Sequence, residues 1–140
     1  MVLGAFKRRK DRGANLVEFA ILAPLLILLV FGIVEFGYFL GQYNEVRHGA
    51  HEGSRLAAVN DPDLIDRTCS SMGLGSDVTV DFTRSGSSIG DQASITVSKT
   101  VSSLSGLGFM ESLLPDALST TAEFRLEQQA TWPTGAQSCT

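Results

Sequence analysis

The feature that most constrains this chain is an apolar run close to its N-terminus. Residues 19–34 pass without a charged side chain, and the wider apolar stretch covers residues 16–40, with the carboxylates Glu18 and Glu35 inside it. A helix of twenty-five residues is long enough to cross about 30 Å of hydrocarbon with some tilt. We therefore expect one membrane-spanning helix, with the remainder of the chain folding outside the bilayer.

Charge is distributed unevenly on the two sides of this run. Residues 1–13 carry five basic side chains and one acidic side chain, a net charge of +4, whereas the whole chain has a net charge of −4. The remainder therefore has a net charge of −8. Basic residues beside a membrane helix favour the cytoplasmic side, so we expect the N-terminus inside and the acidic part outside. An acidic folded part also argues against nucleic acid as a partner.

The two cysteines, Cys69 and Cys139, both fall in the part expected outside the cytoplasm. An oxidising compartment permits a disulfide between them, and two unpaired thiols are the alternative. Closing so long a loop would stabilise the fold by about 4 kcal/mol in the chain-entropy model.

Helical spacing continues beyond the apolar run, so residues 14–59 are expected to form one long helix. Pro24 lies inside it and removes one backbone donor, which should bend or loosen the helix there. The Asn60-Asp61-Pro62 sequence should end it, because a residue before proline disfavours helical geometry. A short helix over residues 62–72, capped by Asp61, is expected to follow.

Small residues recur on this helix at intervals of four. Gly37 and Gly41 form one row, and Gly49, Gly53 and Ala57 form another. Each row offers a face that another backbone or a sheet can approach closely. In the alternative interpretation, these glycines only weaken the helix, by up to about 1 kcal/mol each.

The C-terminal half shows the alternation typical of strands. Residues 78–83 and 93–101 alternate apolar with polar side chains around a Ser/Gly-rich loop and predict a hairpin, with Lys99 at the rim of the sheet. A third strand is expected over residues 118–127, and a turn of helix over residues 108–114. The predicted fold is α+β, a three-stranded antiparallel sheet packed on the outer half of the long helix.

A family resemblance appears in the same N-terminal region. Gly13 stands after a Lys/Arg-rich leader and is followed five residues later by Glu18 and then Phe19, which resembles the processing site of type IV prepilins. The continuation through Pro24, and a later segment that contains Glu52-Gly53-x-Arg55, resembles the TadE-like pseudopilins of tight-adherence pili. The resemblance covers residues 13–59.

This resemblance implies a pilin-like architecture and a role in assembly. A prepilin peptidase would remove the leader, residues 1–13, by cutting after Gly13, and Ala14 would become the new N-terminus. Residues 14–40 would be the transmembrane helix and residues 41–140 an extracytoplasmic head. The chain would be a minor pilin or pseudopilin of the cytoplasmic (inner) membrane, with other pilins, the assembly platform and the lipid bilayer as partners, and it could be incorporated into an extracellular pilus.

Within this resemblance Glu18, Phe19 and Pro24 are expected to dock the helix during assembly. Cleavage would expose a protonated α-amino group, and the Glu18 carboxylate could pair with Ala14 of a neighbouring subunit. The alternative is a carboxylate at the membrane edge with no partner. Glu35 is expected near the outer interface, beside aromatic residues.

The sequence contains no motif typical of an enzyme. His48, His51 and Glu52 have helical spacing, but their order is not that of a zinc protease, and a solvated helix face explains them. We expect no catalytic residues, no metal and no cofactor. The alternative functions are a single-pass anchored extracytoplasmic binding module unrelated to pili and, with less support, a tethered hydrolase. Retention of residues 1–13 would favour the first alternative.

Overall fold

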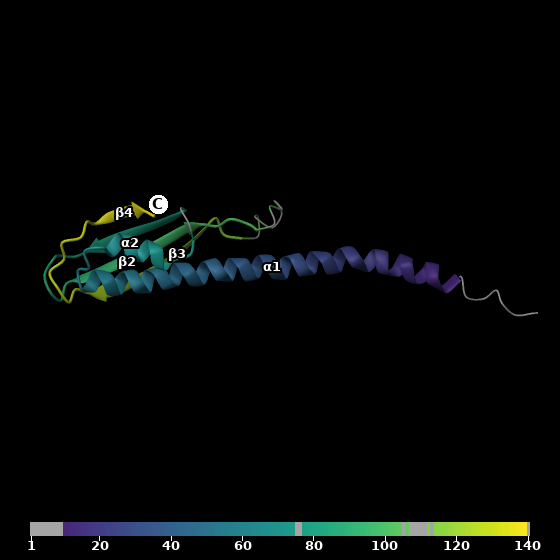
Figure 1. The fold of residues 1–140 in the computed structure, drawn as a ribbon, viewed down its shortest axis with the longest axis horizontal. Helices are drawn as coiled ribbons and strands as arrows, with labels where there is room; N and C mark the ends of the chain where they lie inside the picture. Colours follow the sequence, from purple (N-terminus) through teal and green to yellow (C-terminus); the bar gives the residue numbers. More distant parts are fainter. Residues whose placement is uncertain (1–9, 75–76, 105, 107–111, 113, 140) are drawn as a thin grey trace, which may run out of the picture. The chain divides into compact units, whose positions relative to one another are not determined.

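The structure is a computed structural model, and it describes residues 10–74, 77–104, 106, 112 and 114–139. The element order is α1, α2, β1, β2, β3 and β4 (Figure 1). The chain divides into two compact units, Met1–Gly37 and Tyr38–Thr140, which are described separately below. Helix α1 supplies residues to both units. The second unit, called the head from here on, contains all other elements.

Helix α1 extends over Lys10–Ala58 without interruption, passing through Pro24. It begins four residues before the expected start, so Gly13 and Ala14 lie within its first turns. Its C-terminal end is a Schellman motif. Asn60 takes a left-handed conformation (φ 52°), the Asn60 N–H donates to the Ala57 carbonyl (3.2 Å) and the Asp61 N–H donates to the Leu56 carbonyl (3.0 Å). The predicted end of the helix is therefore confirmed.

Helix α2 is shorter than predicted and covers Leu64–Ser71. Asp61 is not its cap. The Asp61 carboxylate instead accepts the N–H of Asp63 (2.9 Å) and pairs with Arg67, so that Asp61, Pro62 and Asp63 form a turn before the helix. Asp63 occupies the N-cap position without a side-chain hydrogen bond to the backbone. The predicted start was too early because this local side-chain turn competes with helical geometry.

The sheet is antiparallel and has four strands rather than the three predicted. Strands β1 (Val78–Arg84), β2 (Gln92–Thr100), β3 (Ala117–Arg125) and β4 (Gly135–Ser138) stand in the order β3-β2-β1-β4. Strand β4 was missed because it has four residues, no β-branched side chain and no apolar alternation. The predicted hairpin of β1 and β2 and the predicted third strand are confirmed.

One face of this sheet packs on the outer part of α1 and on α2. Inward side chains such as Phe82, Ile95 and Val97 are fully buried and share one core with Val46 and Ala50 of α1. The opposite face carries mostly hydroxyl and charged side chains, as the alternating burial of each strand shows. The alternation in the sequence thus produces a two-layer head with one covered face and one open face.

Two polar side chains lie at the end of this core, near the start of the head. Lys99 is buried rather than at an open rim, and its ammonium donates to the Leu74 carbonyl (3.2 Å). Gln42 is buried on α1, and its amide donates to the Ser102 carbonyl (3.4 Å). The turn of helix expected over residues 108–114 lies largely outside the described residues.

Candidate processing and docking site

The residues expected to carry processing and docking all lie on the first turns of α1. Gly13, Ala14, Glu18, Phe19 and Pro24 are exposed in the isolated chain. No hydrogen bond or ion pair of the Glu18 side chain occurs within the described part of the chain. Because Pro24 has no N–H, the carbonyl of the residue four positions earlier loses its usual helical partner. The segment therefore presents a lone carboxylate and a locally weakened helix.

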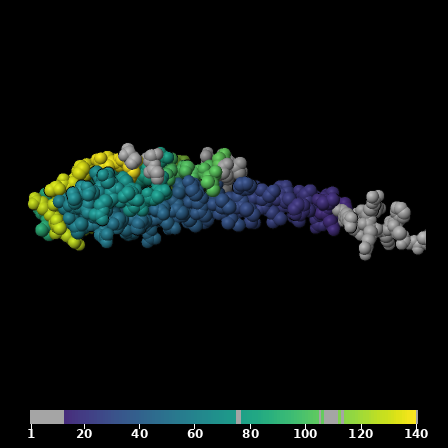
Figure 2. Space-filling view, in the orientation of Figure 1, coloured from purple at the N-terminus to yellow at the C-terminus, as the bar shows by residue number. Residues whose placement is uncertain are grey.

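Glu18 stands at the edge of a continuous apolar surface. The large side chains from Leu16 to Val34 are about half to three-quarters exposed, and Ile21 reaches 72%. Figure 2 shows this stretch in purple and blue. The region Gly13–Ala58 contains a window with a mean hydropathy of 2.7, none of it buried, so one described helix is long and apolar enough to cross a membrane. Glu35 differs from its neighbours, because only 2% of it is exposed.

The two rows of small residues have different surroundings. At Gly49 and Gly53 a Cβ atom would crowd the neighbouring side chains, with Met72 Cγ at 2.6 Å and Thr68 Cγ2 at 2.9 Å respectively. Ala57 of the same row is fully buried. This row therefore packs against α2 and the sheet.

A Cβ atom at Gly37 or Gly41 would instead meet nothing within 4 Å in the described structure. These two glycines do not serve the packing of the head. Their open face is the surface that another helix could approach closely.

The contrast between the two rows predicts opposite effects of alanine on the stability of the head. Gly53→Ala is expected to destabilise it by about 1–2 kcal/mol, because overpacking against Ile95 and Thr68 exceeds the gain in helix propensity. Gly41→Ala, the matched control, is expected to leave the head unchanged or to stabilise it by up to about 1 kcal/mol. Denaturation of the full chain in detergent, followed by the fluorescence of its single tryptophan, measures both; equal effects would contradict this assignment.

A tryptophan cluster, which the sequence analysis did not predict, stabilises the end of the head where α1 ends. The Trp132 indole N–H donates to the Ala57 carbonyl (3.0 Å), and its ring packs on Phe82 and Phe124 at centroid distances of 5.5 and 6.5 Å. The Arg84 guanidinium lies 4.9 Å above the same ring. These contacts join the segment between β3 and β4 to the end of α1, so Trp132 has a structural role.

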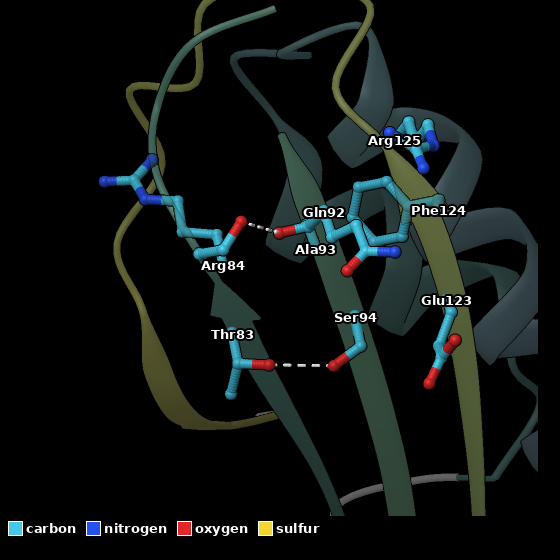
Figure 3. Close-up of a pocket in the computed structure, with 9 residues that line it drawn as sticks. Thr83, Arg84, Gln92, Ala93, Ser94, Glu123, Phe124 and Arg125 are labelled. Atoms are coloured by element: carbon cyan, nitrogen blue, oxygen red, sulfur yellow. Dashed lines mark hydrogen bonds between the residues drawn. The ribbon is translucent and has the colours of Figure 1, made fainter. Parts of the chain in front are cut away.

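The open face of the sheet contains a shallow groove of about 460 Å³ near the same end. Thr83, Ser94 and Glu123 are among the side chains drawn in Figure 3, and the hydroxyls of Thr83 and Ser94 are hydrogen-bonded (2.7 Å). Arg125 at the rim donates to the Gly90 carbonyl (3.1 Å). Some of the polar groups that line the groove are therefore already hydrogen-bonded within the head. The groove lies on the opposite face of the sheet from α1.

The polar residues at helical spacing on α1 form no common site. His48 and His51 are exposed, whereas Glu52 pairs with Arg55 at 3.1 Å. Among the described residues no group of three or more His, Cys, Asp or Glu side chains is arranged to hold a metal ion.

The predicted disulfide is present. Cys69 of α2 and Cys139, which follows β4, are bonded with their Cα atoms 5.5 Å apart. The bond closes a loop with a sequence separation of 70 residues and joins α2 to the edge of the sheet.

Comparison with known proteins agrees with the N-terminal motif. The family model described as TadE-like protein matches residues 13–55, which include the processing motif, the apolar run and the Glu-Gly-x-Arg segment. The predicted resemblance is thereby confirmed over this segment. No curated protein and no solved structure matches the chain.

Proposed function

Because residues 13–55 are TadE-like, we propose that this chain is a minor pilin or pseudopilin that acts in the assembly of a tight-adherence type IV pilus. The observation that carries the proposal is the coincidence of the family match with an exposed apolar helix that contains a lone carboxylate, Glu18. Ionisable groups at the border of a membrane segment are costly, and they usually serve a function.

In this proposal the protein is anchored once in the cytoplasmic membrane. The basic leader stays inside and the apolar part of α1 crosses the bilayer, in agreement with the positive-inside rule. The head lies outside, where an oxidising environment supports the bond between Cys69 and Cys139. The length and exposure of the apolar helix support the anchor, and the disulfide supports the location of the head.

The protein is then the substrate of a prepilin peptidase and not a catalyst. The bond between Gly13 and Ala14 lies in the first turns of α1, which the proposed anchoring puts at the membrane border. A peptidase requires an extended backbone, so these turns must unwind before cleavage. Glycine assists this step, because it weakens a helix by about 1 kcal/mol relative to alanine and leaves the bond without side-chain obstruction.

Cleavage after Gly13 creates the group that Glu18 would recognise. The new α-amino group of Ala14 is protonated near neutral pH, and Glu18 lies four residues further along the helix. A negative charge in the first turns is favourable toward the helix dipole within one subunit. Between subunits, the carboxylate and the α-ammonium group compensate each other in an apolar environment. We propose that this pair guides the helix into the pilus or its assembly base.

The proposal predicts that the mature protein begins at Ala14. Mass spectrometry of the protein from cells with an active prepilin peptidase is expected to find residues 1–13 removed. Gly13→Val is expected to reduce cleavage at least tenfold, because a branched side chain obstructs the site and stiffens the backbone. Gly32→Val is the matched control, since Gly32 also has open space around it, and it should be cleaved normally.

Retention of residues 1–13 would contradict the proposal. If residues 1–13 are retained in cells that process their other prepilins, the chain acts as a single-pass anchored binding module, and the pilin assignment is wrong.

A further inference from the structure

The free edge of β3 is a long, regular strand edge with no partner in the described chain. Strand β3 pairs with β2 on one side only, through nine consecutive residue pairs from Gln92↔Arg125 to Thr100↔Ala117. The register has no bulge and the strand contains no proline, and its two charged side chains, Glu123 and Arg125, both stand near its C-terminal end. Natural proteins usually blunt a sheet edge with such features, because an open edge is a template for another strand.

The register also shows which backbone groups face outward. The ladder between β2 and β3 continues at both ends through hydrogen bonds from the Leu126 N–H to the Asp91 carbonyl (3.0 Å) and from the Val101 N–H to the Asp116 carbonyl (3.0 Å). Hydrogen-bonded pairs alternate in an antiparallel ladder, so the even-numbered residues of β3 bond to β2. The N–H and C=O groups of Ser119, Thr121 and Glu123 therefore point to the free edge.

The opposite edge of the sheet is β4, which is short and uncharged. The Cys139 N–H donates to the Val78 carbonyl (2.9 Å), so by the same alternation the odd-numbered residues of β4 bond to β1. The N–H and C=O groups of Ala136 and Ser138 point outward. The two edges of one head thus present complementary backbone groups, and β4 has no charge that would repel Glu123 or Arg125 of β3.

We propose that β3 of one copy of this chain pairs with β4 of a second copy beside it. Strand direction supports this occupant. Each neighbouring pair in the order β3-β2-β1-β4 is antiparallel, so β3 and β4 also run in opposite directions. A copy placed side by side therefore offers β4 antiparallel to β3, with both α1 helices running the same way. Antiparallel pairing of β3 with β3 would reverse one α1, which two copies anchored in one membrane do not permit.

The side chains on the two edges fit one register. With Thr121 opposite Ser138 and Glu123 opposite Ala136, the outer face gains a hydroxyl pair like those already present, Thr96 with Thr121 (2.8 Å) and Thr83 with Ser94 (2.7 Å). On the inner face Phe124 comes opposite Gly135. Aromatic residues opposite a strand glycine cover backbone that the glycine leaves exposed.

This contact is heterologous, because β3 and β4 are different surfaces of the same head. Such a contact does not close on itself as an isologous dimer does, and it continues into rows of copies. The inference requires a shared membrane but no pilus, so it goes beyond the proposed function and can fail independently of it.

Site-specific photocross-linking in the full-length chain tests the contact. A benzoylphenylalanine at position 123, in purified protein reconstituted in vesicles of phosphatidylethanolamine and phosphatidylglycerol, is expected to give a ladder of dimer and trimer. The adducts should map to residues 135–139 of the second copy. The same probe at position 96, in the central strand β2 and on the same open face, is expected to give no adduct.

Two substitutions at one position separate backbone pairing from side-chain contact. Thr121→Pro removes an outward N–H and the hydroxyl bonded to Thr96 but leaves the backbone bonds to β2, and it is expected to reduce the cross-linked dimer and trimer at least tenfold. Thr121→Val removes the same hydroxyl but keeps the N–H, and it should stay within twofold of the unsubstituted chain. Ala136→Pro on β4 is the reciprocal variant and should match Thr121→Pro. Tryptophan fluorescence and an intact disulfide verify that each variant is folded.

The proposal is overturned if position 123 gives no adduct, or if adducts map to β3 of the second copy or to a different protein. It is also overturned if a folded Thr121→Pro chain gives as much cross-linked dimer and trimer as the unsubstituted chain. None of these results bears on cleavage after Gly13, because the vesicles contain the uncleaved protein and no peptidase. Conversely, a chain that keeps its leader in cells, and so contradicts the proposed function, can still give cross-linked dimer and trimer in vesicles.

Discussion

Replacing both cysteines by serine is expected to lower the free energy of unfolding of the head by about 4 kcal/mol. The bond between Cys69 and Cys139 closes a loop with a sequence separation of 70 residues, and the chain-entropy model gives this size for the loss. The effect is large because the bond fixes β4, which has only four residues and pairs with β1 alone. Without it the C-terminal segment is held mainly by Trp132 and that short ladder.

The measurement is denaturant unfolding of the full chain in detergent, followed by the fluorescence of Trp132, which is buried in the head. Reductant should destabilise the unsubstituted chain by a similar amount and should leave the Cys69→Ser/Cys139→Ser chain unchanged, which makes that variant the control. A serine chain within 1 kcal/mol of the unsubstituted chain would show that the short strand and the tryptophan cluster hold the C-terminus without the bond.

Glu18→Gln is expected to leave membrane insertion intact and to reduce incorporation into pili at least tenfold. The substitution keeps the shape of the side chain and one acceptor oxygen but removes its charge. In the proposed assembly an α-ammonium group would then be left without its counter-ion in an apolar environment. Loss of one partner of such a buried pair costs about 3–5 kcal/mol, which is more than a hundredfold in an equilibrium constant.

Comparison of the pilus fraction with the membrane fraction measures this effect. Glu52→Gln is the matched control, because Glu52 of α1 pairs with the exposed side chain of Arg55, and such an ion pair contributes little. Its incorporation should be unchanged. Normal piliation with Glu18→Gln would show that Glu18 is only a charge at the edge of the membrane, and the docking role would then be wrong.

The features that the sequence alone determined are those coded by local pattern. The apolar run predicts a helix that is long and apolar enough to cross a membrane, and the period-two alternation predicts β1, β2 and β3 because one sheet face must be buried. The Asn60-Asp61-Pro62 stop was also predictable, because backbone sterics act over neighbouring residues.

Only the tertiary structure decided the features that depend on distant partners. Strand β4 has no apolar alternation and forms because β1 offers it a ladder and the bond to Cys69 holds its end. The two rows of small residues look alike in the sequence, yet Gly53 is enclosed by Ile95 and Thr68 whereas Gly41 is open. The free edge of β3 likewise follows from strand order. Long-range packing sets each of these, because a strand or a glycine acquires its role from the element that lies against it.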